Sequence, residues 1–152
     1  MATTSGQITE QNKRLAREYL EAVENHTDGR IENLTDLVAA DVVNHTPVSR
    51  DELTPGEERG IDLFRKHTEA VTRGFSDVHF DIHDMLAEDD RVLVRFDVVG
   101  THDGMFMGVE PTGKPVRIST FGLYRFDDGK LVERWSESDL VSFLSQVGAI
   151  DL

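Results

Sequence analysis

The chain has 152 residues, the length of one ordinary domain, and 38% of them are hydrophobic while 30% are charged. This composition is typical of a globular protein and excludes a disordered or fibrous chain. Asp and Glu outnumber Lys and Arg by 29 to 16, so the net charge of -13 would repel a nucleic-acid backbone. No apolar run reaches the roughly 20 residues of a membrane helix. We therefore expect neither a nucleic-acid partner nor a membrane partner.

The first residues carry neither a basic cluster nor an apolar stretch, so we expect a disordered tail over 1–8 and a single domain over 9–152. A cytoplasmic location is the default expectation for such a chain. The sequence contains no cysteine, which excludes disulfides and cysteine-based metal sites. A dense acidic surface with few lysines is typical of proteins that work at high salt, where ions screen self-repulsion. We therefore predict a halophilic source, and an ordinary acidic protein is the alternative.

The N-terminal half has apolar residues at helical spacing, interrupted by a segment rich in proline and glycine. Thr9 has the side chain of an N-cap for the first helix. The predicted segments are a helix over 9–25, a second over 31–38, an extended piece over 42–45, an irregular stretch over 46–59 and a helix that begins at 61 and ends just before Gly74.

From Val78 the apolar period changes from 3.6 to 2, which predicts strands. The strands are expected near 78–87, 91–102, 115–126 and 131–138, joined by two tight turns and one longer loop. A short helix follows, and Asp139 has the spacing of its N-cap. Helices followed by an antiparallel meander predict an α+β domain, in which the helices cover one face of a curved sheet.

Residues 100–148 contain Gly-Thr-His-x-Gly, Pro-Thr-Gly-Lys, Arg-Phe-x-Asp-Gly-Lys and Glu-x-Trp-x-x-x-Asp in this order. These motifs, together with Asn44-His45-Thr46-Pro47 upstream, resemble those of the SnoaL-like polyketide cyclases, also called predicted ester cyclases. The resemblance implies a cone-shaped curved antiparallel sheet with N-terminal helices covering its concave face, the fold of the nuclear-transport-factor-two-like group. It also implies a mostly apolar pocket for a small carbonyl, ester or polyketide-like ligand, and no cofactor.

The catalytic residues of this family are matched only in part. Named cyclases place an acid directly after the strand Trp for a cofactor-free aldol closure, but here Ser136 follows Trp135. Arg95 and Asp97 are similar to the Arg-x-Asp pair of the related limonene-epoxide hydrolases, and His45 lies where those enzymes hold a residue that orients water. The resemblance thus implies Arg95, Asp97 and His45 as catalytic residues of a cyclase, an isomerase or a hydrolase. Ser136 favours a non-catalytic binding module instead.

Two arrangements of the strand over 91–102 are possible. Its alternation alone would bury Val94 against the helices and leave Arg95 and Asp97 in water. The resemblance favours the reverse, with both charges in the pocket. That arrangement turns apolar residues outward, and we expect a second copy of the chain to cover them in a homodimer. The predicted interface residues are Phe96, Phe121, Leu123 and Trp135.

Further side chains are expected around the pocket. The predicted ligand-binding residues are Tyr19, Phe64, Thr101, Ile118, Thr120, Arg134 and Ser136. His79, Asp81 and His83 alternate along one strand face, but no fourth metal ligand is evident, so we expect solvated surface and no metal. His67 lies beside the apolar stripe of its helix, where a packed or half-exposed histidine is more common than a catalyst. His102 either faces a ligand entrance or shapes the adjoining turn.

Overall fold

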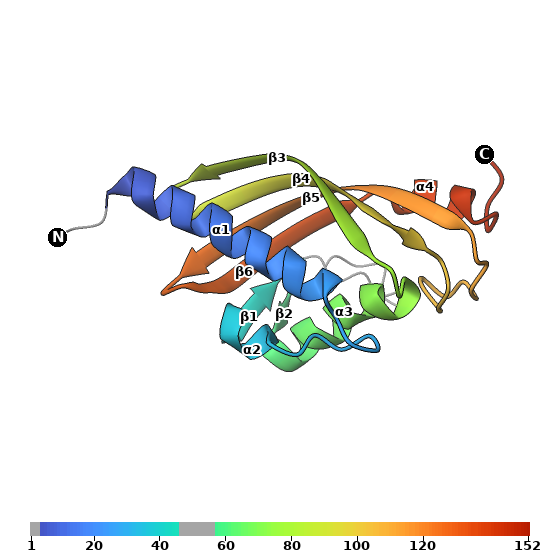
Figure 1. Cartoon of the computed structure of the whole chain (residues 1–152), viewed down its shortest axis with the longest axis horizontal. Coiled ribbons are helices and arrows are strands. Elements are labelled where there is room, and N and C mark those ends of the chain that lie inside the picture. The colour runs from blue at the N-terminus through green and yellow to red at the C-terminus, as the bar shows by residue number, and fades with distance from the viewer. Residues whose placement is uncertain (1–3, 46–56) are drawn as a thin grey trace.

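The computed structural model describes residues 4–45 and 57–152. Within them, six strands form one curled, unclosed sheet in the order β2-β1-β6-β5-β4-β3 (Figure 1). The elements are α1 (Ser5–Glu24), α2 (Leu34–Leu37), β1 (Val38–Asn44), β2 (Glu58–Arg59), α3 (Ile61–Gly74), β3 (His79–Glu88), β4 (Arg91–Thr101), β5 (Pro115–Asp127), β6 (Lys130–Ser138) and α4 (Leu140–Gln146). The strands β3 to β6 form an antiparallel meander, whereas β1 runs parallel to β6.

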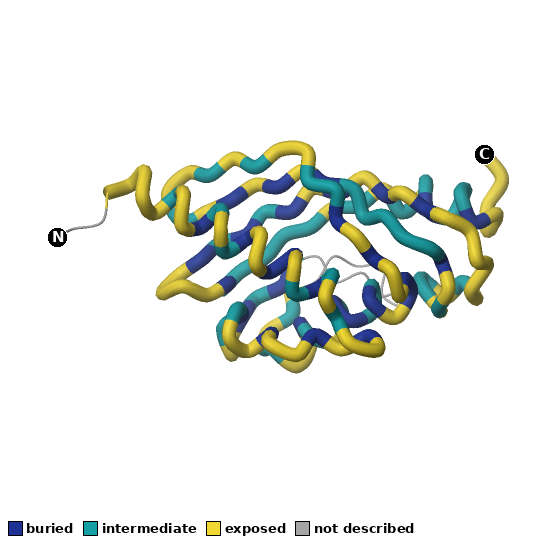
Figure 2. The backbone as a smooth tube through the Cα atoms, in the orientation of Figure 1, coloured by how far each residue is buried: buried dark blue, intermediate teal, exposed yellow. Residues whose placement is uncertain are grey.

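Helices cover one face of this sheet, which we call the inner face; the opposite face is the outer face. α1 packs on β3 and β4, α3 packs on β1, and α4 packs on the first residues of β5 (Figure 1). Along β4, Val92, Val94 and Phe96 are buried on the inner face, while Leu93 and Arg95 between them are exposed (Figure 2). This alternation follows from the period of two in a strand. The predicted α+β architecture with N-terminal helices over a curved sheet is confirmed.

The first helix begins earlier than the apolar spacing predicts. Thr4, and not Thr9, is its N-cap. Thr4 Oγ1 accepts a hydrogen bond from the backbone N–H of Gln7 at 3.1 Å, and Gln7 Oε1 accepts one from the backbone N–H of Thr4 at 2.9 Å. This capping box satisfies two donors that a helix start otherwise leaves unpaired. Residues 5–8 are therefore helical and not part of a disordered tail, and residues 1–3 lie outside the described residues.

The C-terminal half agrees with the sequence pattern more closely. All four predicted strands are found, with ends that differ by at most one residue. Asp139 caps α4 as predicted, since its Oδ1 accepts a hydrogen bond from the backbone N–H of Ser142 at 3.0 Å. Gly74 differs from expectation because it ends α3 instead of following it. A Cβ at Gly74 would lie 2.9 Å from Phe106 Cβ, so glycine is needed for this close contact. In the described part of the chain, no helix has the length and apolarity needed to cross a membrane.

Candidate functional site

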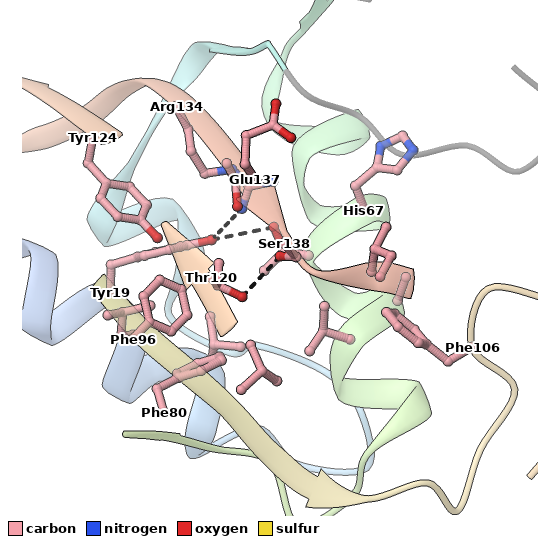
Figure 3. Close-up of a pocket in the computed structure, with 18 of the residues that line it drawn as sticks. Tyr19, His67, Phe80, Phe96, Phe106, Thr120, Tyr124, Arg134, Glu137 and Ser138 are labelled. Atoms are coloured by element: carbon pink, nitrogen blue, oxygen red, sulfur yellow. Dashed lines mark hydrogen bonds between the residues drawn. The ribbon is translucent and has the colours of Figure 1, made fainter. Parts of the chain in front are cut away.

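The inner face and the helices enclose a cavity of about 200 Å³ (Figure 3). An apolar cavity of roughly 150 Å³ accommodates one benzene ring, so this volume suits a compound of one or two rings. Its wall comes from α1, α3, the strands β3 to β6, the loop between β4 and β5, and the first residue of α4. Most of the wall is apolar, and its larger apolar side chains include Leu20, Phe80, Phe96, Val98, Phe106 and Leu140. Such a lining favours an apolar ligand body.

One side of this wall carries a polar cluster centred on Arg134, which projects inward from β6. Its Nη1 donates a hydrogen bond to Tyr19 Oη at 3.0 Å (Figure 3). Its Nε donates one to Asn44 Oδ1 at 3.3 Å. The guanidinium also lies 4.6 Å from the centre of the Phe64 ring. Tyr19 Oη lies 3.5 Å from Thr68 Oγ1. Arg134 is thus fixed by three neighbours, while the described hydrogen bonds use only two of the five donors of a guanidinium.

Hydroxyl groups extend the polar side of the cavity along β5 and β6. Thr120 and Ser138 are lateral neighbours, and their hydroxyl oxygens are 3.0 Å apart (Figure 3). Ser136 also lines the cavity. Tyr124 is fully buried, and burial raises the pKa of its hydroxyl, so the group stays neutral. A Cβ at Gly122 would lie 2.5 Å from the Tyr124 hydroxyl oxygen, so glycine leaves the space which that hydroxyl occupies.

His67 projects from α3 at the edge of the cavity (Figure 3). Its Nδ1 lies 2.6 Å from Oε2 of Glu58, which belongs to the short strand β2, and 3.2 Å from the Leu63 carbonyl oxygen. The contact with Leu63 has the better hydrogen-bond direction, and Glu58 Oε2 is buried without a well-directed hydrogen bond. The imidazole is therefore held between two acceptors on one side.

The prediction that Arg95 and Asp97 point into the pocket is wrong. Phe96, which lies between them, is only 4% exposed and lines the cavity, so its predicted place in an outer interface is wrong too. Arg95 Nε donates to Asp84 Oδ2 at 2.6 Å, and Asp97 Oδ2 accepts from Arg117 Nη1 at 2.7 Å, both on the outer face. Burying the apolar side chains of β4 leaves Arg95 and Asp97 in water, where charged groups are stable. The alternation of the strand, and not the resemblance to the hydrolases, therefore determines which face of β4 lies inside.

Asp97 belongs to a charged cluster on the outer face. Hydrogen bonds from His83, at 2.9 Å, and from Arg117 hold the pKa of the Asp97 carboxyl below its usual range. Arg117 Nη1 also binds Asp81 Oδ2 at 3.0 Å. The ligand atoms of Asp81, His83 and Asp97 lie within 4.8 Å of one another, but the Arg117 guanidinium already supplies the positive charge that a cation would bring.

His45 lies on the outer face as well, so the prediction that it orients water in the pocket is wrong. Its ring stacks on Trp135, with centroids 4.5 Å apart and an interplanar angle of 5°. Its Nε2 contacts Glu133 Oε2 at 2.5 Å. Burial raises the pKa of the Glu133 carboxyl, but the hydrogen bonds from Arg125 and His45 outweigh burial and lower it overall. The strand alternation explains the placement, since Asn44, the residue before His45, takes the inner face.

The predicted ligand-binding residues separate into two groups. Tyr19, Thr120, Arg134 and Ser136 line the cavity. The other three do not: Phe64 lies behind Arg134, Ile118 is buried in the core, and Thr101 donates a hydrogen bond to Asp77 on the sheet surface. The pairing of His67 with Glu58 was not expected from the sequence. A signal for His67 was present, because its helical spacing from Phe64 and Val71 places it beside the buried stripe.

Comparison with known proteins places these features in a family context. The family model described as SnoaL-like polyketide cyclase matches residues 13–147. Wild-type IdmH from Streptomyces antibioticus, a proposed polyketide cyclase, is 29% identical, with 91% of this chain and 99% of that chain covered and a TM-score of 0.76.

AclR from Streptomyces galilaeus, a proposed hydroxylase, is 28% identical, with coverage of 95% and 85% and a TM-score of 0.78. A proposed SnoaL-like polyketide cyclase from Jannaschia sp. CCS1 is 18% identical, covers 99% of this chain and 100% of its own, and has a TM-score of 0.80, a likeness of fold alone. Comparison with curated protein sequences gives no significant match.

Proposed function

Because the chain belongs to the SnoaL-like polyketide cyclase family, we propose that it binds a small, mostly apolar carbonyl compound and cyclises or isomerises it without a cofactor. The observation that carries this proposal is the Arg134 and Tyr19 pair at one side of an otherwise apolar cavity. A ligand oriented by these two groups would have its carbonyl oxygen at the pair and its carbon skeleton along the apolar wall.

Charge supports a role for Arg134 in the reaction. Among the described residues, no carboxylate lies within ion-pair distance of this half-buried guanidinium, and most of its neighbours in the cavity are apolar or carry hydroxyl groups. A buried charge without a counterion is costly. An oxygen that gains negative charge as an enolate forms would supply the missing counterion, and the guanidinium would stabilise it more in the transition state than in the ground state.

There are two alternatives to a cyclase or isomerase, a hydrolase and a non-catalytic binding module. A limonene-epoxide-hydrolase-like reaction through Arg95 and Asp97 loses its support, because both side chains lie on the outer face. A non-catalytic binding module is favoured by Ser136, since a serine at the position of the family acid cannot take up a proton as a carboxylate does. Turnover of a probe ketone separates the module from the enzyme, while binding is common to both.

The binding part of the proposal is tested with 2-tetralone, an apolar bicyclic ketone of suitable size, by isothermal titration calorimetry. Arg134→Gln should weaken its binding about tenfold or more, which corresponds to roughly 1.4 kcal/mol. Arg95→Gln is the matched control, because Arg95 lies on the outer face and is not expected to affect binding. Equal affinities of the Arg134 variant and the wild type would contradict the proposal.

For the oligomeric state, we propose a homodimer through an apolar row on the outer face. The row consists of lateral neighbours on β3, β4, β5 and β6, which are Leu86, Leu93, Leu123 and Trp135. Phe121, 48% exposed, adjoins it, and Leu86 is 65% exposed. An apolar row that spans four strands is unusual on a monomer surface, and a two-fold partner with the same row would cover it.

Sedimentation velocity tests this interface. The wild type should sediment as a dimer, and Phe121→Glu should convert it to a monomer with an unchanged circular dichroism spectrum. Phe96 offers no such test, since it is buried on the inner face. A monomeric wild type at every concentration, or a dimer that persists in Phe121→Glu, would refute the interface.

A further inference from the structure

The proposed reaction needs a group that takes and returns a proton, and few described lining residues qualify. Arg134 remains protonated in proteins and cannot accept a proton. Burial raises the pKa of Tyr124, so its hydroxyl does not ionise at neutral pH. Glu137 is exposed and alternates with Ser136 and Ser138, which places its side chain on the outer side of β6. The histidine of the lining, His67, is the group that remains (Figure 3).

The surroundings of His67 fix which of its nitrogens carries a proton. Nδ1 faces the Leu63 carbonyl oxygen at 3.2 Å and Glu58 Oε2 at 2.6 Å. Both partners are acceptors, and neither the carbonyl nor an ionised carboxylate has a hydrogen to donate. The proton of the neutral ring therefore lies on Nδ1, and Nε2 keeps its lone pair. This tautomer is the one a general base needs.

Glu58 holds the imidazole of His67 through a direct contact with Nδ1. Its Oε2 is buried and has no well-directed hydrogen-bond donor among the described residues. A buried carboxylate oxygen is stabilised by a cation in contact with it. When Nε2 accepts a proton, the resulting imidazolium places a positive charge 2.6 Å from Glu58 Oε2. The contact thus orients the imidazole, and the Glu58 carboxylate lies beside the cation that forms when the reaction delivers a proton to Nε2.

We propose, on the basis of the proposed function, that His67 is the general acid–base residue of the cavity and that Glu58 is its positioning residue. His67 Nε2 removes a proton from the carbon next to the ligand carbonyl. The C–H electron pair forms the enolate double bond, and the carbonyl π pair moves onto the oxygen near Arg134. In a cyclisation, the enolate carbon then attacks a second carbonyl carbon of the same ligand, and the new alkoxide recovers the proton from His67.

In this chain the proposed proton-transfer residue lies on a helix, whereas the resemblance places it on a strand of the sheet. The resemblance places the family acid on β6, at Ser136, whereas His67 lines the edge of the cavity from α3 and Glu58 of β2 contacts His67. β2 is held beside β1 by the pairing of Glu58 with Asn44, and Asn44 in turn binds Arg134. The base and the oxyanion group are thus connected through one short edge of the sheet.

The test uses hydrogen–deuterium exchange next to the carbonyl of 2-tetralone in D2O, followed by proton NMR. The wild type should accelerate exchange over buffer, and His67→Ala should lower kcat at least 100-fold with little change in KM, as expected for a lost acid–base group. Free imidazole should raise the kcat of His67→Ala at least tenfold, a rescue that a purely structural role of His67 does not predict. His79→Ala is the matched control, because His79 contacts Glu24 at 3.1 Å in a similar pair outside the cavity.

Glu58 is tested in a double-mutant cycle. Glu58→Gln should lower kcat about tenfold in the wild type and leave the residual rate of His67→Ala unchanged, since a positioning residue acts only through the imidazole. His67→Gln, which is closer in size, replaces His67→Ala if the latter melts early. An unaltered rate in either His67 variant, or a Glu58→Gln loss that persists without His67, would overturn the assignment.

The same probe separates this inference from the proposed function. If 2-tetralone binds and Arg134→Gln weakens binding, but the wild type does not accelerate exchange, the acid–base assignment is wrong while the binding proposal stands. If exchange depends on His67 but binding is insensitive to Arg134, the assignment stands and the oxyanion role of Arg134 is wrong.

Discussion

Replacing Phe96 by alanine should destabilise the protein much more than replacing its neighbour Arg95. Phe96 is 4% exposed, and burying a phenylalanine side chain contributes roughly 1.5–3 kcal/mol. Its edge-to-face contact with Phe80, at 5.4 Å between centroids, adds about 1 kcal/mol. Because Phe96 borders a cavity, few neighbouring side chains could move into the space that the alanine leaves empty. We expect a loss of about 3–4 kcal/mol, or a Tm lower by roughly 6–16 °C in a domain of this size.

Arg95→Ala on the same strand is the internal control. The Arg95 and Asp84 side chains are 46% and 58% exposed, and pairs of this kind contribute about 0.2–1 kcal/mol. Differential scanning calorimetry of both variants at one pH and salt concentration gives the comparison. If Arg95→Ala lowered Tm as much as Phe96→Ala, β4 would present its charged side to the core, and the inner and outer faces described above would be exchanged.

Three further outcomes follow from the geometry. Asp97→Asn should cost roughly 1 kcal/mol at pH 7, and the difference from wild type should fade as the pH drops below about 3.8. The reason is that hydrogen bonds from His83 and then Arg117 lower the pKa of the Asp97 carboxyl, so this stabilisation exists only while the carboxyl is ionised. Gly104→Ala should cost about 1–3 kcal/mol in urea unfolding, because a Cβ there would lie 1.8 Å from the Arg73 carbonyl oxygen. Thermal stability should rise from low to molar potassium chloride as the net charge of -13 is screened, and a flat or falling profile would contradict the halophilic interpretation.

The strands of the meander were predictable because their signal is local. Alternation and turn residues within 78–138 define each hairpin, and all four strands were found. The start of α1 was also encoded locally, by the spacing of Thr4 and Gln7. It was placed too late because the prediction followed the apolar residues, which begin further along the helix. The face of β4 was mispredicted although its own alternation was right. Arg95 and Asp97 resembled a catalytic pair of a related family, and that resemblance was given more weight than the burial of Phe96.

The lining residues could be predicted where the period of a single helix or strand determines them, as for Tyr19 on α1 and Thr120 on β5. Arg134 and Ser136 follow from the period of β6, and both line the cavity. The pairing of His67 with Glu58 could not be read from the sequence, because β2 has only two residues and exists through its contacts with β1. Tertiary contacts of this kind leave no periodic trace along the chain.

The parallel pairing of β1 with β6 has a consequence for when the site forms during folding. The partners Tyr19 and Arg134 are separated by 115 residues, and Asn44 and Arg134 by 90. The antiparallel meander has short loops to close, whereas these contacts close long ones and are expected to form late. A partly folded chain with an intact meander would therefore hold Arg134 without the groups that orient it. A ligand bound at Arg134 would stabilise the fully folded chain against every partly folded form, so thermal shift is a suitable first screen for it.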